Sequence, residues 1–281
     1  MLIDSHCHLD APEFDPDRGD VIVRARAAGV RAQVLPAVSA ASWPTLRDVC
    51  TSAPGLYAAY GLHPMYLAEH REDHLDRLRE WIERERPVAV GECGLDFFVE
   101  GLDRERQQRF FDGQLRLARD FDLPLIVHAR RAVDQVLASF RRFAPLRGVV
   151  HSFSGSEDQA KRLIDAGFML GLGGPTTYER AQRLRRIAAS MPLDALLLET
   201  DAPDQPDALM RGQRNEPGRL PVVCATIASL REMTTEALAE ATARNAVRLF
   251  ALPEPVDGAS DREGAARTAA PRLARNDISP E

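Results

Sequence analysis

Short apolar runs alternate with longer segments of mixed apolar and charged residues along most of this chain. The apolar runs are rich in Val, Leu and Ile and have the length of buried strands, whereas the segments between them have the spacing of amphipathic helices. The runs predict eight strands, at residues 2–5, 32–37, 56–61, 88–92, 125–128, 148–152, 168–172 and 195–200. The intervening segments predict helices that include residues 70–85, 103–121, 132–143, 157–166 and 178–189, and further helices at 221–231 and 235–249 follow the last strand.

Eight strand–helix repeats predict an α/β protein with a (β/α)8 TIM barrel. A doubly wound open sheet has the same alternation, but polar residues directly follow several of these strands, and barrel enzymes place their chemistry at the carboxyl ends of the strands. Residues 1–252 are expected to form a single barrel domain. Residues 253–281 are rich in Ala, Pro, Gly, Asp and Arg with few large apolar side chains, so we expect a disordered tail.

Composition narrows the class of protein further. The 281 residues are 44% hydrophobic and 28% charged, which is typical of a globular protein. The 36 basic and 42 acidic residues give a formal net charge of −6, which argues against a protein that holds nucleic acid by bulk attraction. The chain lacks CxxC pairs, a signal-peptide pattern and any apolar run of membrane-spanning length. We therefore expect a cytoplasmic protein without a membrane partner. A monomer is expected as well.

Metal-ligating residue types stand at the ends of five predicted strands. His6 and His8 lie two positions apart after the first strand, where alternation along an extended chain turns both side chains to one side. A His-x-His pair alone is a weak signal, but ligand-type residues also end four other strands, and a buried apolar strand does not require polar groups there. The candidate metal ligands are His6, His8, Glu92, His128, His151 and Asp201.

Four imidazoles and two carboxylates exceed what one tetrahedral ion uses, whereas two ions that share a bridging carboxylate would use them all. The sequence therefore predicts a centre of two divalent ions, and hydrolysis is the reaction class that such a centre suits. His and carboxylate ligands suit several metals, so Mg2+, Mn2+ and Zn2+ all stay open.

Other residues near the predicted barrel mouth are candidates for binding a substrate. The loop after the last strand reads RGQRNEP and places Arg211, Arg214 and Asn215 there. Guanidinium groups match phosphate oxygens, and asparagine can orient a polar group, although a solvated basic loop is the alternative. Arg130 and His63, just after the fifth and third strands, are further candidates. The alternatives are that Arg130 pairs with a ligand carboxylate and that His63 has a structural role. His70 and His74 lie four residues apart among charged residues, so we predict that they lie on a solvated helix face.

Several motifs together resemble the TatD family of metal-dependent hydrolases, within the amidohydrolase-like barrels. The matching stretches are DSHCHLD, GLHP, GECGLD, LPLIVHAR, HSFSGS, LLLETDAP, RGQRNEP and ATARNAVRLF. They extend over nearly all of the predicted domain. The resemblance implies a TIM-barrel enzyme that uses divalent metal to remove nucleotides from DNA, typically from the 3′ end.

The resemblance also implies roles for the six candidate ligands. One ion would be held by His6, His8 and Asp201, the other by His128 and His151, and Glu92 would bridge the two. Asp201 would also act as general base toward the attacking water. His63 and the arginines of RGQRNEP would contact the scissile phosphate and its neighbours.

The chain departs from the family pattern at Asp204 and Gln205, where the family often has an aromatic–leucine pair after LETDAP. Substrate packing at the mouth is therefore expected to differ. The tail from residue 253 also lies outside the family pattern.

The favoured function is a 3′–5′ exodeoxyribonuclease acting on DNA 3′ ends. The alternative is a barrel hydrolase of a carbonyl substrate, such as an aminoacyl-tRNA deacylase or a small ester or amide hydrolase, because the same ions activate water toward a carbonyl. A binding protein on an enzyme scaffold is a third class, disfavoured by the complete ligand set.

Residues 253–281 contain six acidic residues and four arginines, which leaves a formal net charge of −4 for residues 1–252. Two divalent ions would neutralise that charge, so a focused site for one strand end is compatible with the acidic composition.

Overall fold

The eight predicted strands form one parallel sheet that curls into a barrel. In the computed structural model, which describes residues 1–253, the strands pair in chain order from β1 to β8. Their bounds are β1 Leu2–Asp4, β2 Val30–Pro36, β3 Leu56–Tyr60, β4 Ala89–Asp96, β5 Leu125–Arg130, β6 Gly148–Val150, β7 Phe168–Leu172 and β8 Leu196–Leu198. The predicted (β/α)8 fold is confirmed.

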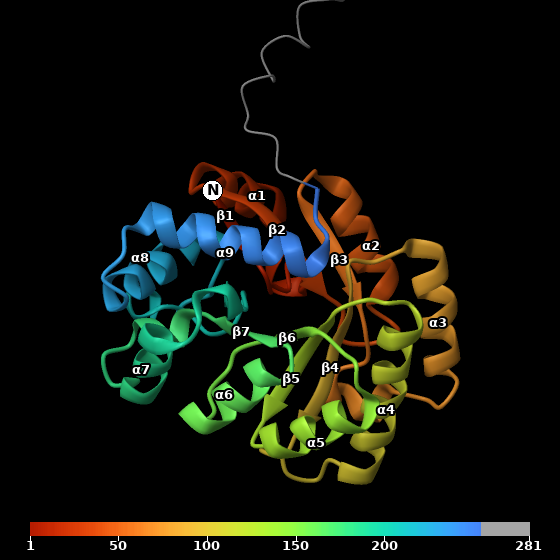
Figure 1. Cartoon of the computed structure of the whole chain (residues 1–281). Helices are drawn as coiled ribbons and strands as arrows, with labels where there is room; N and C mark the ends of the chain where they lie inside the picture. Colours follow the sequence, from red (N-terminus) through yellow and green to blue (C-terminus); the bar gives the residue numbers. More distant parts are fainter. Residues whose placement is uncertain (254–281) are drawn as a thin grey trace, which may run out of the picture.

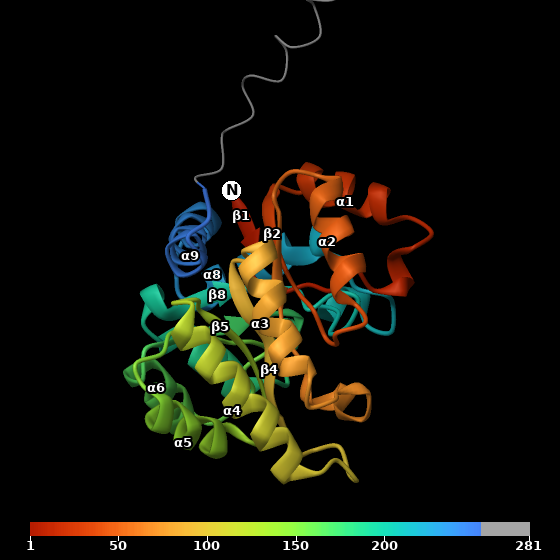
Figure 2. The same ribbon diagram turned by 90° about the vertical axis from the view of Figure 1, so that its right-hand side faces the viewer.

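Helices follow one another around the outside of the barrel in chain order (Figure 1). They are α1 Arg18–Ala27, α2 Trp43–Ser52, α3 His74–Glu85, α4 Arg104–Asp120, α5 Val133–Phe143, α6 Glu157–Asp165, α7 Gln182–Ser190 and α8 Leu220–Leu230. Large apolar side chains such as Trp43, Phe111 and Phe168 are fully buried in the layer between helices and strands. Helix α4 packs against β4, and α3 packs against α4 and β3 (Figures 1 and 2).

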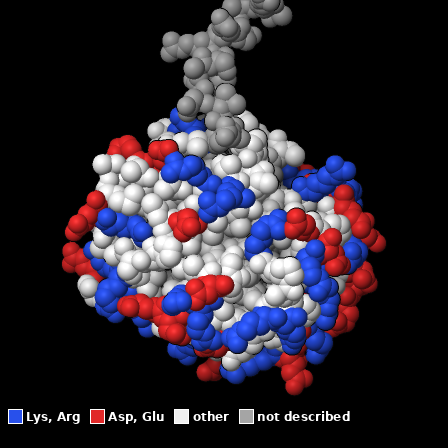
Figure 3. Space-filling view, viewed as in Figure 1, with Lys and Arg blue, Asp and Glu red and all other residues white. Residues whose placement is uncertain are grey.

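The last helix, α9 Thr235–Phe250, closes the amino end of the barrel. Its apolar residues pack against apolar side chains inside the barrel, such as Ala32, Ala59 and Ile126, in one buried cluster. Asn245 donates hydrogen bonds to the carbonyl oxygens of Leu193 and Leu196, at the start of β8. Helix α9 crosses in front of the strands in Figure 1, and on that face acidic and basic side chains are interspersed (Figure 3). Helix α9 does not cover the opposite, carboxyl end of the barrel, so that end is available for a functional site.

The seam between β1 and β8 is joined by hydrogen bonds outside the regular sheet pairing. The backbone N–H and the hydroxyl of Ser5 both donate to the carbonyl oxygen of Leu198, each at 3.0 Å. Just beyond the strands, Asp201 N–H donates to His6 O at 2.9 Å, and His8 N–H donates to Ala202 O at 2.7 Å. The segments that follow β1 and β8 are therefore fixed side by side.

The structure differs from the predicted elements at several places. Strand β4 continues four residues past Glu92 to Asp96, and the helix predicted from residue 70 begins at His74, after a 3-10 helix at residues 64–69. The predicted solvated face is wrong. His70 is 1% exposed and its Nε2 donates to the carbonyl oxygen of His63 at 2.8 Å, and His74 is 5% exposed.

The prediction of a disordered tail concerns residues that, apart from Pro253, lie outside those the structure describes. Among residues 1–253, no helix combines the length and apolar character needed to cross a bilayer.

Candidate metal centre

The six predicted ligands converge at the carboxyl end of the barrel, from five different strands. Nε2 of His6 and Nε2 of His8 lie 3.1 Å apart, so the two imidazoles face one point. Oδ1 of Asp201 lies 3.4 Å from His6 Nε2 and 3.7 Å from His8 Nε2. His128 and His151 approach each other on the other side, with Nδ1 of His128 at 3.4 Å from Nε2 of His151.

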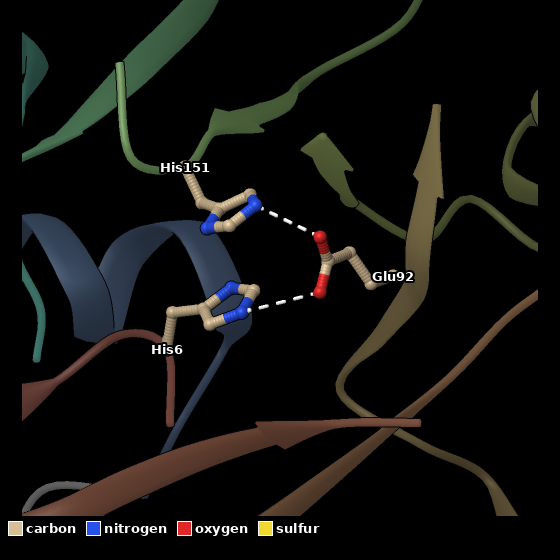
Figure 4. A group of neighbouring side chains, drawn as sticks. All are labelled: His6, Glu92 and His151. Carbon is tan, nitrogen blue, oxygen red and sulfur yellow. Dashed lines mark ion pairs between the residues drawn. The ribbon is translucent and has the colours of Figure 1, made fainter. Parts of the chain in front are cut away.

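The carboxylate of Glu92 lies between these two groups of histidines. Its Oε2 is 3.3 Å from His6 Nε2 and 3.5 Å from His8 Nε2. Its Oε1 is 2.8 Å from Nε2 of His151 and 3.3 Å from Nδ1 of His128. Figure 4 shows His6 and His151 each directed at a different oxygen of Glu92. This is the arrangement that a bridging carboxylate requires.

The donor atoms fit a metal centre better than a hydrogen-bonded cluster. Nε2 of His151 and of His63 both lie 2.8 Å from Glu92 Oε1, yet this buried oxygen has no aligned hydrogen-bond partner. The rings of His6 and His151 are stacked with centroids 3.8 Å apart, which is unfavourable for two protonated imidazoles. Ligand atoms cluster in three groups, and within each group they lie no more than 4.8 Å apart. The groups are His6, Glu92 and His151; His6, His8 and Asp201; and His63, Glu92 and His128.

Burial and the charge of Glu92 set the protonation of the centre. Burial lowers the pKa of His63 to about 4 despite the attraction of Glu92. For His8 and His151 burial acts in the same direction, but interaction with Glu92 prevails and raises the pKa values to about 9 and about 10. Burial favours neutral Glu92, but attraction to His63, His151 and His6 holds its pKa well below the usual range. Protonated histidines therefore supply positive charge around an ionised Glu92 when no cation is bound.

Asp4 is a positioning residue that the sequence analysis did not single out. Its buried carboxylate accepts hydrogen bonds from the backbone N–H of Thr200 at 3.0 Å, from the Thr200 hydroxyl at 2.5 Å and from the N–H of His6 at 3.2 Å. It therefore ties the end of β1 to the end of β8, which sets His6 beside Asp201. Asp4 stands two residues before His6 in sequence, and that proximity was its one available signal.

Two further carboxylates lie near the ring nitrogens of His128 and His151 that do not face Glu92. Oδ2 of Asp96 lies 3.0 Å from Nε2 of His128. Glu199 is 1% exposed, accepts a hydrogen bond from the N–H of Ser152, and lies 3.9 Å from Nδ1 of His151. Ligand histidines commonly have such carboxylate partners, which fix the ring orientation. Glu199 stands within LLLETDAP, and Asp96 ends GECGLD, so both lay inside the recognised motifs without an assigned role.

Glu199 reaches its place because β7 carries glycine there. A Cβ built on Gly171 would lie 2.0 Å from Glu199 Oε2, so no larger residue fits without moving the carboxylate. Burial raises the pKa of Glu199 to about 8.

The centre lies at the floor of a pocket of about 1080 Å3, lined among others by Tyr66, Arg130 and Phe153. His63 lies next to Glu92 and belongs to one of the three ligand groups. It is therefore closer to the metal centre than its predicted substrate-binding role requires. Arg130 lines the pocket with its guanidinium over the ring of Phe98, 3.7 Å from the centroid.

The RGQRNEP loop is arranged differently from the prediction. Within residues 1–253, the lining of this pocket does not include Arg211, Arg214 or Asn215. Arg214 forms a two-bond ion pair with Asp17 at 2.8 and 2.7 Å, so its guanidinium faces the loop before α1. Asn215 is buried and donates to the carbonyl oxygen of Thr200 at 2.9 Å. Through Asn215 this loop positions the end of β8, and the guanidinium of Arg214 is engaged away from the centre.

Gln205, one of the two residues that depart from the family pattern, contacts the centre directly. Its Nε2 donates hydrogen bonds to Oδ2 of Asp201 and to the hydroxyl of Ser152. Oδ1 of Asp201 faces His6 and His8, so the two carboxylate oxygens have different environments.

Comparisons with known proteins agree with this site. The family model described as "TatD related DNase" matches residues 3–251. The chain is 42% identical over 256 residues to the "uncharacterized metal-dependent hydrolase YjjV" of Escherichia coli K12, a match that covers 90% of this chain and 98% of the relative. The crystal structure of YjjV superimposes with a TM-score of 0.86 at 41% identity, over the same shares of the two chains.

A relative from Erwinia billingiae, named "3'-5' ssDNA/RNA exonuclease TatD", is 34% identical over 260 residues, which are 90% of this chain and 100% of the relative. The family match extends over nearly all of the described residues, including all six ligand positions. The chain therefore belongs to the TatD family of metal-dependent hydrolases.

Proposed function

We propose that this chain is a 3′–5′ exodeoxyribonuclease that hydrolyses phosphodiester bonds at a centre of two divalent ions. The observation that carries the proposal is the carboxylate of Glu92, whose two oxygens face separate histidine groups at the floor of an open pocket. The printed name of the Erwinia relative supports DNA or RNA as the substrate class. We propose that the enzyme is a monomer and acts in the cytoplasm.

In this proposal His6, His8 and Asp201 would hold one ion, His128 and His151 would hold the other, and Glu92 would be shared. When bound, the ions supply Lewis acidity that polarises a phosphoryl oxygen and lowers the pKa of water. Mg2+, Mn2+ and Zn2+ are the candidates. The nitrogen-rich ligand set favours Mn2+ or Zn2+ over Mg2+, which prefers oxygen ligands.

Asp201 is proposed as the general base. Burial raises the pKa of its carboxyl, which makes the carboxylate a better proton acceptor than an exposed aspartate. Gln205 holds Oδ2, while Oδ1 faces the centre, so one oxygen is oriented for the proton of the attacking water. His63 and Arg130 are proposed to contact the scissile phosphate, His63 as a neutral imidazole and Arg130 through its guanidinium.

The proposal is tested with purified protein, Mg2+, Mn2+ or Zn2+, and 3′-labelled single-stranded DNA. We expect mononucleotide release by the wild type and its loss in Glu92→Ala, since the shared carboxylate is removed. Equal release by both proteins would reveal a contaminating nuclease and contradict the proposal. Release of an amino acid from charged tRNA without strand shortening would instead assign the centre to carbonyl hydrolysis.

A further inference from the structure

A second hollow, of about 460 Å3, adjoins the pocket above the metal centre. The two share Ala129, Arg130 and Ser154 in their linings, so they form one continuous depression. The second hollow lies between the loop that leads into α5 and the loop that leads into α6. A substrate held at the centre can therefore extend into it.

Three arginines line this hollow: Arg130, Arg131 and Arg183. In the part of the chain that the structure describes, none of them lies within ion-pair distance of a carboxylate. The acidic residue at the edge, Asp134, is already paired with Arg162 at 2.8 Å. The hollow thus carries a concentration of uncompensated positive charge on a protein that is acidic overall.

The guanidiniums are held in place by contacts that leave their charge unneutralised. Phe98 is 42% exposed, and the guanidinium carbons of Arg130 and Arg131 lie 3.7 and 4.6 Å from its ring centroid. Arg183 donates a hydrogen bond to the carbonyl oxygen of Ser154 at 3.0 Å. Cation–π contacts and a carbonyl partner orient the arginines without removing the need for an anion.

We propose that this second hollow binds a phosphate group of the substrate strand on the 5′ side of the scissile phosphate. The inference rests on the proposed function. An enzyme that cuts at the 3′ end must hold the remainder of the strand on the 5′ side, and guanidinium groups match phosphate oxygens. The hollow therefore makes an oligonucleotide a better substrate than a molecule that carries one phosphate.

The test compares Arg131→Ala/Arg183→Ala with Arg186→Ala, a control on the same helix as Arg183 whose guanidinium pairs with Glu157. The substrates are 3′-labelled dT10 and thymidine 5′-(p-nitrophenyl phosphate), which has a single phosphodiester. We expect the double variant to lose at least about tenfold more kcat/KM on dT10 than on the single-phosphate substrate. Arg186→Ala should show no such difference. Single variants Arg131→Gln and Arg183→Gln repeat the comparison if the double variant folds poorly.

Binding of metal-loaded protein to phosphorothioate-linked dT10, measured by fluorescence anisotropy at several salt concentrations, separates the two proposals. Each lost phosphate contact should reduce the slope of log K against log salt by about 0.7. One outcome is that the salt slope of the wild type exceeds that of the double variant while the wild type releases no nucleotide from 3′-labelled dT10. In that case the nuclease proposal fails and the second site stands. If the double variant matches Arg186→Ala in slope and selectivity, or if the wild type does not bind dT10, the second site is refuted.

Discussion

Nε2 of His128 lies 3.0 Å from Oδ2 of Asp96, on the side of the imidazole that faces away from Glu92. Burial favours the neutral acid, but hydrogen bonds from His128 and from two backbone N–H groups lower the pKa of Asp96 to about 2. An ionised carboxylate only accepts hydrogen bonds, so Nε2 of His128 carries the proton. The other ring nitrogen, Nδ1, lies 3.3 Å from Glu92 Oε1 and is therefore the atom that would bind an ion shared with Glu92.

Asp96→Asn should weaken metal binding, because the amide can present a donor to the Nε2–H of His128. The other oxygen, Oδ1, can still accept from the N–H groups of Phe98 and Val99, so the local loop is retained. We expect a loss of about 10- to 100-fold in Mn2+ affinity by isothermal titration calorimetry. Asp122→Asn, at an exposed residue away from the centre, is the control. Unchanged affinity in Asp96→Asn would show that the His128 tautomer is set in another way.

Metal binding should release protons. In the metal-free protein the pKa values of His8 and His151 are about 9 and about 10, so both imidazoles are protonated at pH 7. A coordinating imidazole must be neutral, so loading the centre at pH 7 displaces about two protons. Apparent affinity then increases as pH rises toward 9, because fewer protons remain to be displaced, and becomes constant above about pH 10. The release is measured with a pH indicator in weak buffer, and a pH-independent affinity would contradict this protonation scheme.

Gly171→Ala should displace Glu199 and destabilise the fold. The added Cβ would overlap Oε2 of Glu199, which is buried and held by the N–H of Ser152. Loss of that hydrogen bond in a packed interior costs about 1–3 kcal/mol in the free energy of unfolding, measured by urea denaturation. Gly19→Ala is the matched control, because its Cβ would meet no atom within 4 Å. Equal stability of the two variants would mean that Glu199 moves without cost.

Gln205→Leu restores the residue type that the family often has and removes the hydrogen bond to Asp201. Burial already raises the pKa of Asp201, and loss of a donor to its carboxylate raises it further. The acid limb of the kcat profile should therefore move to higher pH by about one unit. Gln182→Leu, at an exposed glutamine on α7, is the control. A profile that does not move would exclude Gln205 as a positioning residue for Asp201.

The strands and the helix order were predictable because each depends on local patterns of apolar and polar residues. The convergence of His6, Glu92 and Asp201 was also predictable, because a barrel brings the carboxyl ends of its strands together. The resemblance added family roles to residues that the pattern had already singled out.

Contacts between distant segments were not predictable from spacing. Arg214 was expected at the phosphate, but its partner is Asp17, which lies at the other end of the chain. His70 looked solvated among charged neighbours, and only the 3-10 helix before it turns the ring into the interior. Asp96 lies in a strand extension beyond the apolar run, so the pattern gave it no role.

The central claim is that Glu92 joins two ions in one centre. It is tested most directly by a crystal structure of the Mn2+-loaded protein, with anomalous scattering used to locate the ions, beside Glu92→Ala prepared in the same way. We predict two anomalous peaks in the wild type, one on the side of His6 and His8 and one on the side of His128 and His151, with the Glu92 carboxylate between them. We predict at most one occupied position in Glu92→Ala. A single peak in the wild type, or two fully occupied positions in Glu92→Ala, would contradict the account.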